Sequence, residues 1–290
     1  MIRNASPKAD IASTRRCIAL LLWGMIFFYL RVIHALLFKN TYYSINLVFK
    51  IHVSRVKRMS EFKASNHESA KKINVIITGA TGMVGEGVLH ESLQHPDVER
   101  VLVINRKPCG VTHIKLSEIV HNNFFDLSGV APQLNDYNAC YFCLGVSSVG
   151  MKEEEYKRLT YDLTLHMASL LSSLNPEMIF CYVSGSGTDS TEQGRSMWAR
   201  VKGKTENRLL QLPFKGAYMF RPGYIHPTKG LKNTHGYYSA LSLLYPMLRA
   251  VLPKYVISLR ELGLAMIHIA QTGRERAILE SKDIARIAGT

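Results

Sequence analysis

Over the last 220 or so residues of the chain, short apolar segments typical of strands alternate with segments whose apolar residues recur at helical spacing. The segment 73–78 is short, apolar and rich in β-branched residues, which is typical of a buried strand. It is followed by Val84, Val88 and Leu89, which recur at helical spacing. Further predicted strands lie at 100–105, 118–122, 138–144 and 178–183. Because strands and helices alternate, we predict an α/β fold with a doubly wound parallel sheet.

The last third of the chain continues this alternation less clearly. We expect helices at 153–174 and 258–271 and a short strand at 277–279. The stretch 237–252 carries apolar residues at helical spacing. It could be core, a lid over a substrate, or a surface that lies against a membrane or a second subunit. We therefore predict a small C-terminal cap on the sheet, and leave the oligomeric state open.

The N-terminal segment differs from the rest in both hydrophobicity and charge. Residues 17–38 are apolar apart from Arg31 and His34, and are long enough to cross about 30 Å of hydrocarbon as a helix. Three alternatives stay open: a membrane anchor, a packed helix, or upstream sequence before a true start at Met59. We assign 1–70 to a basic apolar extension and 71–290 to the globular domain. The expected location is the cytoplasm, with a tether to the cytoplasmic face of a membrane if the anchor forms.

The distribution of charge argues against a nucleic-acid partner. The formal net charge is +14, but 1–58 hold ten of the 36 Lys and Arg against Asp10 alone, which leaves only +5 on the remainder. The five cysteines form no disulfide framework, so we expect a reducing compartment. Cys140 and Cys143 are three apart on a predicted strand, so their thiols should point to opposite faces. With no metal spacing among the histidines either, we predict no metal site.

A glycine-rich turn connects the first strand to the first helix. Gly79 allows a tight turn, Gly82 lets the main chain approach a pyrophosphate, and Gly85 lets the helix pack closely. The phosphates would then lie at the positive N-terminus of the helix. The sequence therefore predicts a dinucleotide site whose turn residues are Gly79, Thr81, Gly82, Met83, Val84 and Gly85.

The end of the second predicted strand bears on the choice of dinucleotide. An NAD-binding protein commonly places an acid here to accept the ribose 2′-hydroxyl. This chain instead has Asn105, Arg106 and Lys107, which suit a 2′-phosphate. We therefore favour NADP over NAD, although a strand that ends in solvated basic residues would look the same.

Several motifs together resemble the short-chain dehydrogenase/reductase superfamily. They are TGATGMVG at 78–85, FFDL at 124–127, CLGVS at 143–147, VSGSGTD at 183–189, WARVKG at 198–203 and FRPG at 220–223. The GxxGxxG spacing is similar to that of the extended and atypical members, in particular the NAD(P)H-binding, nucleoside-diphosphate-sugar-epimerase-like branch. The resemblance covers the chain from about Lys72 onward and implies a Rossmann fold. It also implies cofactor contacts at Asp126, Leu127, Leu144, Gly145 and Pro222.

The resemblance further implies a catalytic Tyr four residues before a Lys on one helix. Lys202 stands in the lysine position, but Trp198 occupies the tyrosine position, and an indole cannot serve as an acid or base. Ser184 and Ser186 both suit the expected serine. Candidate substitutes for the tyrosine are Tyr161, Tyr182 and Tyr224.

Two functions follow from these residues. The first is an NADP-dependent oxidoreductase or epimerase-like enzyme that acts on a small-molecule substrate. The second is a non-catalytic NADP-binding sensor or scaffold protein, which Trp198 favours. The substrate cannot be read from the chain.

Overall fold

The computed structural model of this chain describes residues 72–233 and 245–289. No helix among these residues is both long and apolar enough to cross a membrane. The apolar segment 17–38 lies outside them, so the membrane anchor and the location inferred with it stay predictions. The described part begins at the first strand of the predicted globular domain.

Within the described residues, seven strands form one sheet in which every neighbouring pair is parallel. Its order is β3-β2-β1-β4-β5-β6-β9. The strands are β1 (Ile73–Thr78), β2 (Val98–Asn105), β3 (Leu116–Val120), β4 (Ala139–Phe142), β5 (Ile179–Val183), β6 (Gly216–Arg221) and β9 (Ile278–Glu280). The predicted doubly wound parallel sheet is confirmed.

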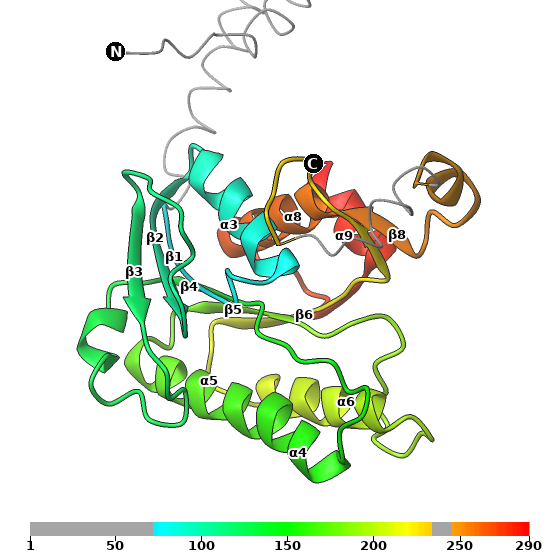
Figure 1. Ribbon diagram of the computed structural model, residues 1–290, viewed down its shortest axis with the longest axis horizontal. Helices are drawn as coiled ribbons and strands as arrows, with labels where there is room; N and C mark the ends of the chain where they lie inside the picture. The colour runs from blue at the N-terminus through cyan, green and yellow to red at the C-terminus, as the bar shows by residue number, and fades with distance from the viewer. Residues whose placement is uncertain (1–71, 234–244, 290) are drawn as a thin grey trace, which may run out of the picture. The chain divides into compact units, whose positions relative to one another are not determined.

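Helices cover both faces of the sheet (Figure 1). One face carries α3 (Met83–Gln94), α8 (Leu259–Thr272) and α9 (Ser281–Ala288). The other carries α4 (Glu153–Lys157), α5 (Leu163–Leu174) and α6 (Met197–Leu209). The fold is therefore the three-layer α/β arrangement that the sequence predicts.

Alternate residues of each strand belong to separate cores on the two faces of the sheet. Val75 and Ile77 pack with α3 and α8, whereas Ile76 packs with α5 on the opposite face. The same alternation separates the two cysteines of the CxxC spacing. Cys140 is buried in the α5 core and Cys143 packs against the α3 core, so the prediction that their thiols diverge is confirmed. Among the described residues no cluster of His, Cys, Asp or Glu could hold a metal ion.

Some elements differ from the sequence prediction. The helix expected at 153–174 is one helical run interrupted by a π-helical turn, η2 (Arg158–Asp162). A second small parallel sheet pairs β7 (Tyr224–His226) with β8 (Val256–Ser258), and neither strand was predicted. Strands of three residues are too short to show an alternating pattern. Of the apolar stretch 237–252, the described part is helical at 245–251.

Gly85 offers a test of how tightly α3 packs on the end of β1. A Cβ atom at Gly85 would overlap the carbonyl group of Gly79, which is main chain and cannot rotate away. We expect Gly85→Ala to lower the free energy of unfolding by about 1–3 kcal/mol, as overpacking typically does. Gly129→Ala is the matched control because a Cβ there meets nothing within 4 Å. Urea denaturation would measure both, and equal stabilities would contradict the close approach.

Candidate functional site

The strand order reverses between β1 and β4, and the loops that follow the central strands meet at this point. In open α/β sheets, ligands bind in the crevice outside the carboxyl ends of the strands at such a switch point. Here the loop segments 79–82, 143–148, 184–190 and 222–223 follow β1, β4, β5 and β6. This edge of the sheet is therefore the candidate site.

The glycine turn has the geometry that the sequence predicts. Gly79 has a φ of +72°, and a Cβ atom there would lie 2.8 Å from the carbonyl oxygen of Cys143, so the turn lies directly against the loop after β4. Gly82 caps the N-terminus of α3 and is open: a Cβ there would meet only the Gly79 carbonyl oxygen, at 3.5 Å. The first N–H groups of α3 have no partners within the helix. Main-chain donors thus lie beside an open glycine surface.

The acidic residue in the first turn of α3 accepts hydrogen bonds from a different loop. Glu86 is buried, and its two carboxylate oxygens accept hydrogen bonds from the main-chain N–H groups of Lys232 (2.8 Å) and Asn233 (2.7 Å). These contacts tie the loop after β7 to the helix that begins at the glycine turn.

Asn105 braces the glycine turn from the end of β2. It is buried, and its side-chain oxygen accepts a hydrogen bond from the Ala80 N–H (3.1 Å). Its amide nitrogen donates to Glu118 (3.4 Å), which also accepts from the Cys109 N–H (2.7 Å). Asn105 therefore has two structural partners in addition to the cofactor role predicted for it.

Glu118 is a site residue that the sequence analysis missed. It lies on β3, but its contacts with Asn105 and Cys109 bring its carboxylate to the loop that follows β2. Arg106 and Lys107 on that loop are exposed. The side-chain alternation of β3 gave no signal that Glu118 would reach this loop.

The residues expected from the family resemblance differ in exposure. Asp126 is exposed, and hydrogen bonds from the Ser128 hydroxyl and N–H lower its pKa. Leu127 is buried in the α5 core, and Leu144 packs against that core. Gly145 is exposed, and a Cβ there meets nothing within 4 Å.

Lys202 lies one turn after Trp198 on α6, as predicted. Its ammonium group donates a hydrogen bond to the main-chain carbonyl of Ser184, at the end of β5. Burial lowers the pKa of Lys202 to about 8, and the nearby carboxylate of Glu206 opposes this shift. The lysine is thus held at the carboxyl edge of the sheet in a poorly hydrated position.

The two candidate serines lie in different environments. The Ser184 hydroxyl is buried and donates to Glu206 (2.5 Å), with the Phe220 carbonyl as a second acceptor at 3.1 Å. Ser186 is only half-buried, and its N–H donates to the carbonyl of Pro222 (2.8 Å). Within the described residues the Ser186 hydroxyl has no hydrogen-bond partner. Ser186 is therefore the better placed of the two to contact a ligand.

The three candidate tyrosines lie on three different elements. Tyr182 is 1% exposed within the α5 core. Tyr161 lies on η2, where it lines a cavity of about 750 Å³ between the loop 125–128 and α5. Tyr224 begins β7, directly after the loop that follows β6, and burial raises its pKa. Of the three, Tyr224 is the one at the carboxyl edge of the sheet.

Comparisons with known proteins support this fold. No family model matches the chain. The protein "Protein fmp52, mitochondrial" of Emericella nidulans is 28% identical over 159 residues, which are 52% of this chain and 66% of that protein. A UDP-N-acetylglucosamine 4-epimerase of Methanobrevibacter ruminantium, solved with UDP-N-acetylmuramic acid, superposes with a TM-score of 0.54 at 16% identity, and the match covers 72% of this chain and 75% of that one.

A short-chain dehydrogenase of Burkholderia cenocepacia, solved with NADP, superposes with a TM-score of 0.53 at 15% identity. The match covers 75% of this chain and 93% of that one. The chain spans slightly less than two thirds of the length of the Emericella relative. At these identities the structures establish the fold alone, so the predicted Rossmann fold is confirmed.

The depressed pKa of Lys202 predicts a pH-dependent stability. The folded protein binds this proton less tightly than the unfolded chain does, so the cost of the buried charge is present below pH 8 and is lost as the pH rises toward 10.5. We expect Lys202→Met to be more stable than wild type at pH 7. This advantage should shrink by at most about 3 kcal/mol between pH 8 and 10.5. Urea denaturation at several pH values measures it, and a constant difference would contradict the burial of a charged Lys202.

Proposed function

We propose that this protein binds an NAD(P) dinucleotide at the carboxyl edge of β1, β4 and β5. The observation that carries this proposal is the open glycine turn at the N-terminus of α3, which lies at the switch point of the sheet. Main-chain N–H groups and the helix dipole favour a pyrophosphate there. The dehydrogenase of Burkholderia cenocepacia, which was solved with NADP, supports the same ligand class on the same fold.

We favour NADP as the dinucleotide. The two exposed cations, Arg106 and Lys107, follow β2 where the 2′-position of the adenosine ribose would lie. Glu118 is the competing influence, because its carboxylate would repel a 2′-phosphate. That carboxylate already accepts hydrogen bonds from the Cys109 N–H and the Asn105 amide. Two cations against one anion leave a net positive site.

The cofactor choice is tested by removing the cations. Arg106→Ala together with Lys107→Ala should weaken NADPH binding by at least about tenfold, because charge-assisted hydrogen bonds to the 2′-phosphate are lost. NADH binding should change little. Fluorescence titration of both nucleotides measures this, and Glu118→Gln should increase the preference for NADPH. An NADH preference in the wild type would show that the cofactor is NAD.

We further propose oxidoreductase or epimerase-like chemistry on a small substrate. When bound, the dinucleotide would supply or accept a hydride. Lys202 would hold the ribose hydroxyls through its ammonium group and favour an ionised acid/base beside it. Ser186 would orient the substrate oxygen. Tyr224 would exchange the proton that Trp198 cannot, since it follows the loop after β6 at the same edge of the sheet.

Two observations favour a second function, a non-catalytic NADP-binding sensor or scaffold. Trp198 packs beside Gly187 on the loop after β5, where a proton donor would be needed. The hydroxyl of Ser184, one of the two candidate serines, is held by Glu206. A protein of this kind would bind the dinucleotide without turning it over.

Substitution of three aromatic residues separates the two functions. If Tyr224 is the acid/base, Tyr224→Phe should lower the rate of NADPH oxidation by about 10²–10⁴-fold, because a positioned proton donor is lost. Tyr137→Phe is the matched control, since Tyr137 precedes β4 and so lies at the opposite, amino edge of the sheet. Trp198→Tyr should add activity if the helix register is right. A panel of carbonyl substrates measures all three, and NADPH binding without turnover in any variant would favour the sensor.

A further inference from the structure

A carboxylate is buried behind the candidate site. Glu206 lies on α6 one turn after Lys202 and has no exposed surface. Its Oε1 accepts hydrogen bonds from the Ser184 hydroxyl (2.5 Å) and from Nε of Arg221 (3.0 Å). Its Oε2 accepts from Nε (3.1 Å) and Nη2 of the same guanidinium. A buried carboxylate stays charged only when it is paired in this way, so these contacts define its role.

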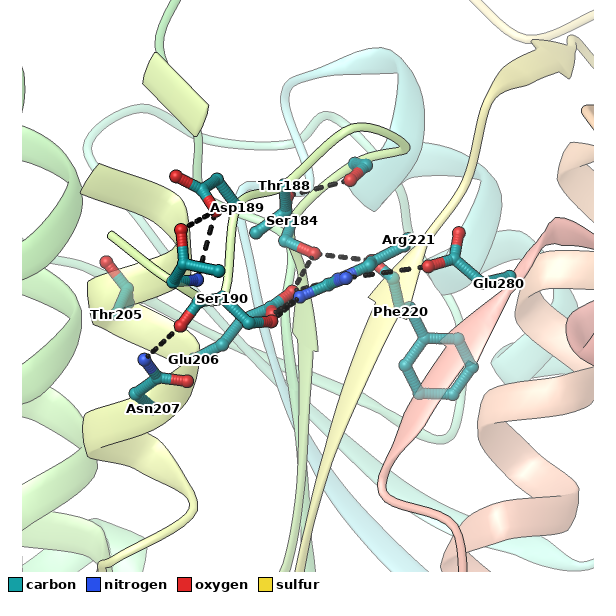
Figure 2. Close-up of polar contacts among 12 residues, drawn as sticks. Ser184, Thr188, Asp189, Ser190, Thr205, Glu206, Asn207, Phe220, Arg221 and Glu280 are labelled. Carbon is teal, nitrogen blue, oxygen red and sulfur yellow. Dashed lines mark hydrogen bonds and ion pairs between the residues drawn. The ribbon is translucent and has the colours of Figure 1, made fainter. Parts of the chain in front are cut away.

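Arg221 is held on its other sides as well (Figure 2). Its Nη2 donates to the Ser190 hydroxyl (2.5 Å), and Nη1 forms an ion pair with Glu280 (3.5 Å). Figure 2 shows the guanidinium between the carboxylates of Glu206 and Glu280. The pair thereby connects α6 with the ends of β6 and β9.

Ser184 links this pair to the candidate site. Its N–H donates to the Phe220 carbonyl (2.9 Å), its hydroxyl donates to Glu206, and its own carbonyl accepts from Lys202. Glu206 and Lys202, both on α6, therefore both contact Ser184 at the end of β5. Glu206 contacts its hydroxyl and Lys202 contacts its carbonyl.

We propose that Glu206 is the positioning residue for Lys202. Through Ser184 it fixes the carbonyl that receives the ammonium group, and its carboxylate favours the charged form of that ammonium. Glu206 never touches the ligand, since it is fully buried. The consequence for dinucleotide binding rests on the proposed function, whereas the effect on Lys202 itself does not.

The charged groups around α6 support an effect of Glu206 on this lysine. On β6, Arg221 is paired with Glu206 and Glu280. On α4, Glu153 is paired with Arg200 (2.6 Å). Burial raises the pKa of Tyr156, on the same helix, and of Tyr182 on β5, so both are neutral near pH 7. Glu206 is thus the carboxylate whose charge acts on Lys202.

Competitive labelling of the protein's amines measures this effect without any ligand. The extent of Lys202 acetylation by acetic anhydride would be followed by mass spectrometry from pH 6 to pH 11. We expect the labelling midpoint of Lys202 to fall by about one pH unit in Glu206→Gln, because a nearby opposite charge is lost. Glu261→Gln is the matched control: it breaks the ion pair with Arg249 at the start of α8 and should leave the midpoint unchanged. A folded Glu206→Gln variant with the wild-type midpoint would overturn the proposal.

A milder variant tests positioning if Glu206→Gln does not fold. Ser184→Ala removes the hydroxyl link and keeps the buried ion pair. We expect it to weaken NADPH binding about tenfold in the wild-type background and not at all in Lys202→Ala. Equal losses in both backgrounds would show that Ser184 and Glu206 act independently of Lys202. If wild type binds neither NADPH nor NADH, the proposed function fails, and the labelling experiment still decides the role of Glu206.

Discussion

Contact between main chain and main chain at the end of β1 determines the geometry of the site. Gly79 lies against the Cys143 carbonyl, and Gly85 lies against the carbonyl of Gly79, with no room for a side chain at either position. This close approach places the N-terminus of α3 at the reversal point of the strand order. The anion-binding capacity follows from that placement, since it uses main-chain donors and the helix dipole.

The second half of the sheet positions its residues by a different means. At the ends of β5 and β6, an ion pair replaces close main-chain contact: the buried carboxylate of Glu206 on α6 pairs with Arg221 and holds the Ser184 hydroxyl, and the partly exposed Glu280 of β9 pairs with the same arginine. Removing one member of a buried pair leaves an uncompensated charge, which is costly. The candidate site therefore has an open glycine turn on one side and a cluster of paired charged side chains on the other.

These two sides bear differently on the proposed function. The glycine turn supports dinucleotide binding whether or not a reaction takes place. Catalysis depends on the other side, where Trp198 stands in the usual tyrosine position and the Ser184 hydroxyl is held by Glu206. We propose Ser186 and Tyr224 as the groups through which a reaction would proceed. The solved neighbours share the fold at 15–16% identity, and the Emericella relative is similar in sequence over 159 residues, so neither comparison decides between the two functions.

The sequence by itself determined the layered α/β fold, the tight turn at Gly79 and close packing at Gly85, the divergence of Cys140 and Cys143, and the register of Trp198 and Lys202. Each is a local property, set by the period of a strand or helix or by the absence of a side chain. Only the tertiary structure placed Glu118 beside the loop after β2 and Glu206 beneath Ser184. It also placed the three candidate tyrosines on different elements and gave the Asn105 side chain two hydrogen-bond partners. These contacts join residues from different elements, and neither spacing nor composition carries information about which side chains meet once the strands are ordered.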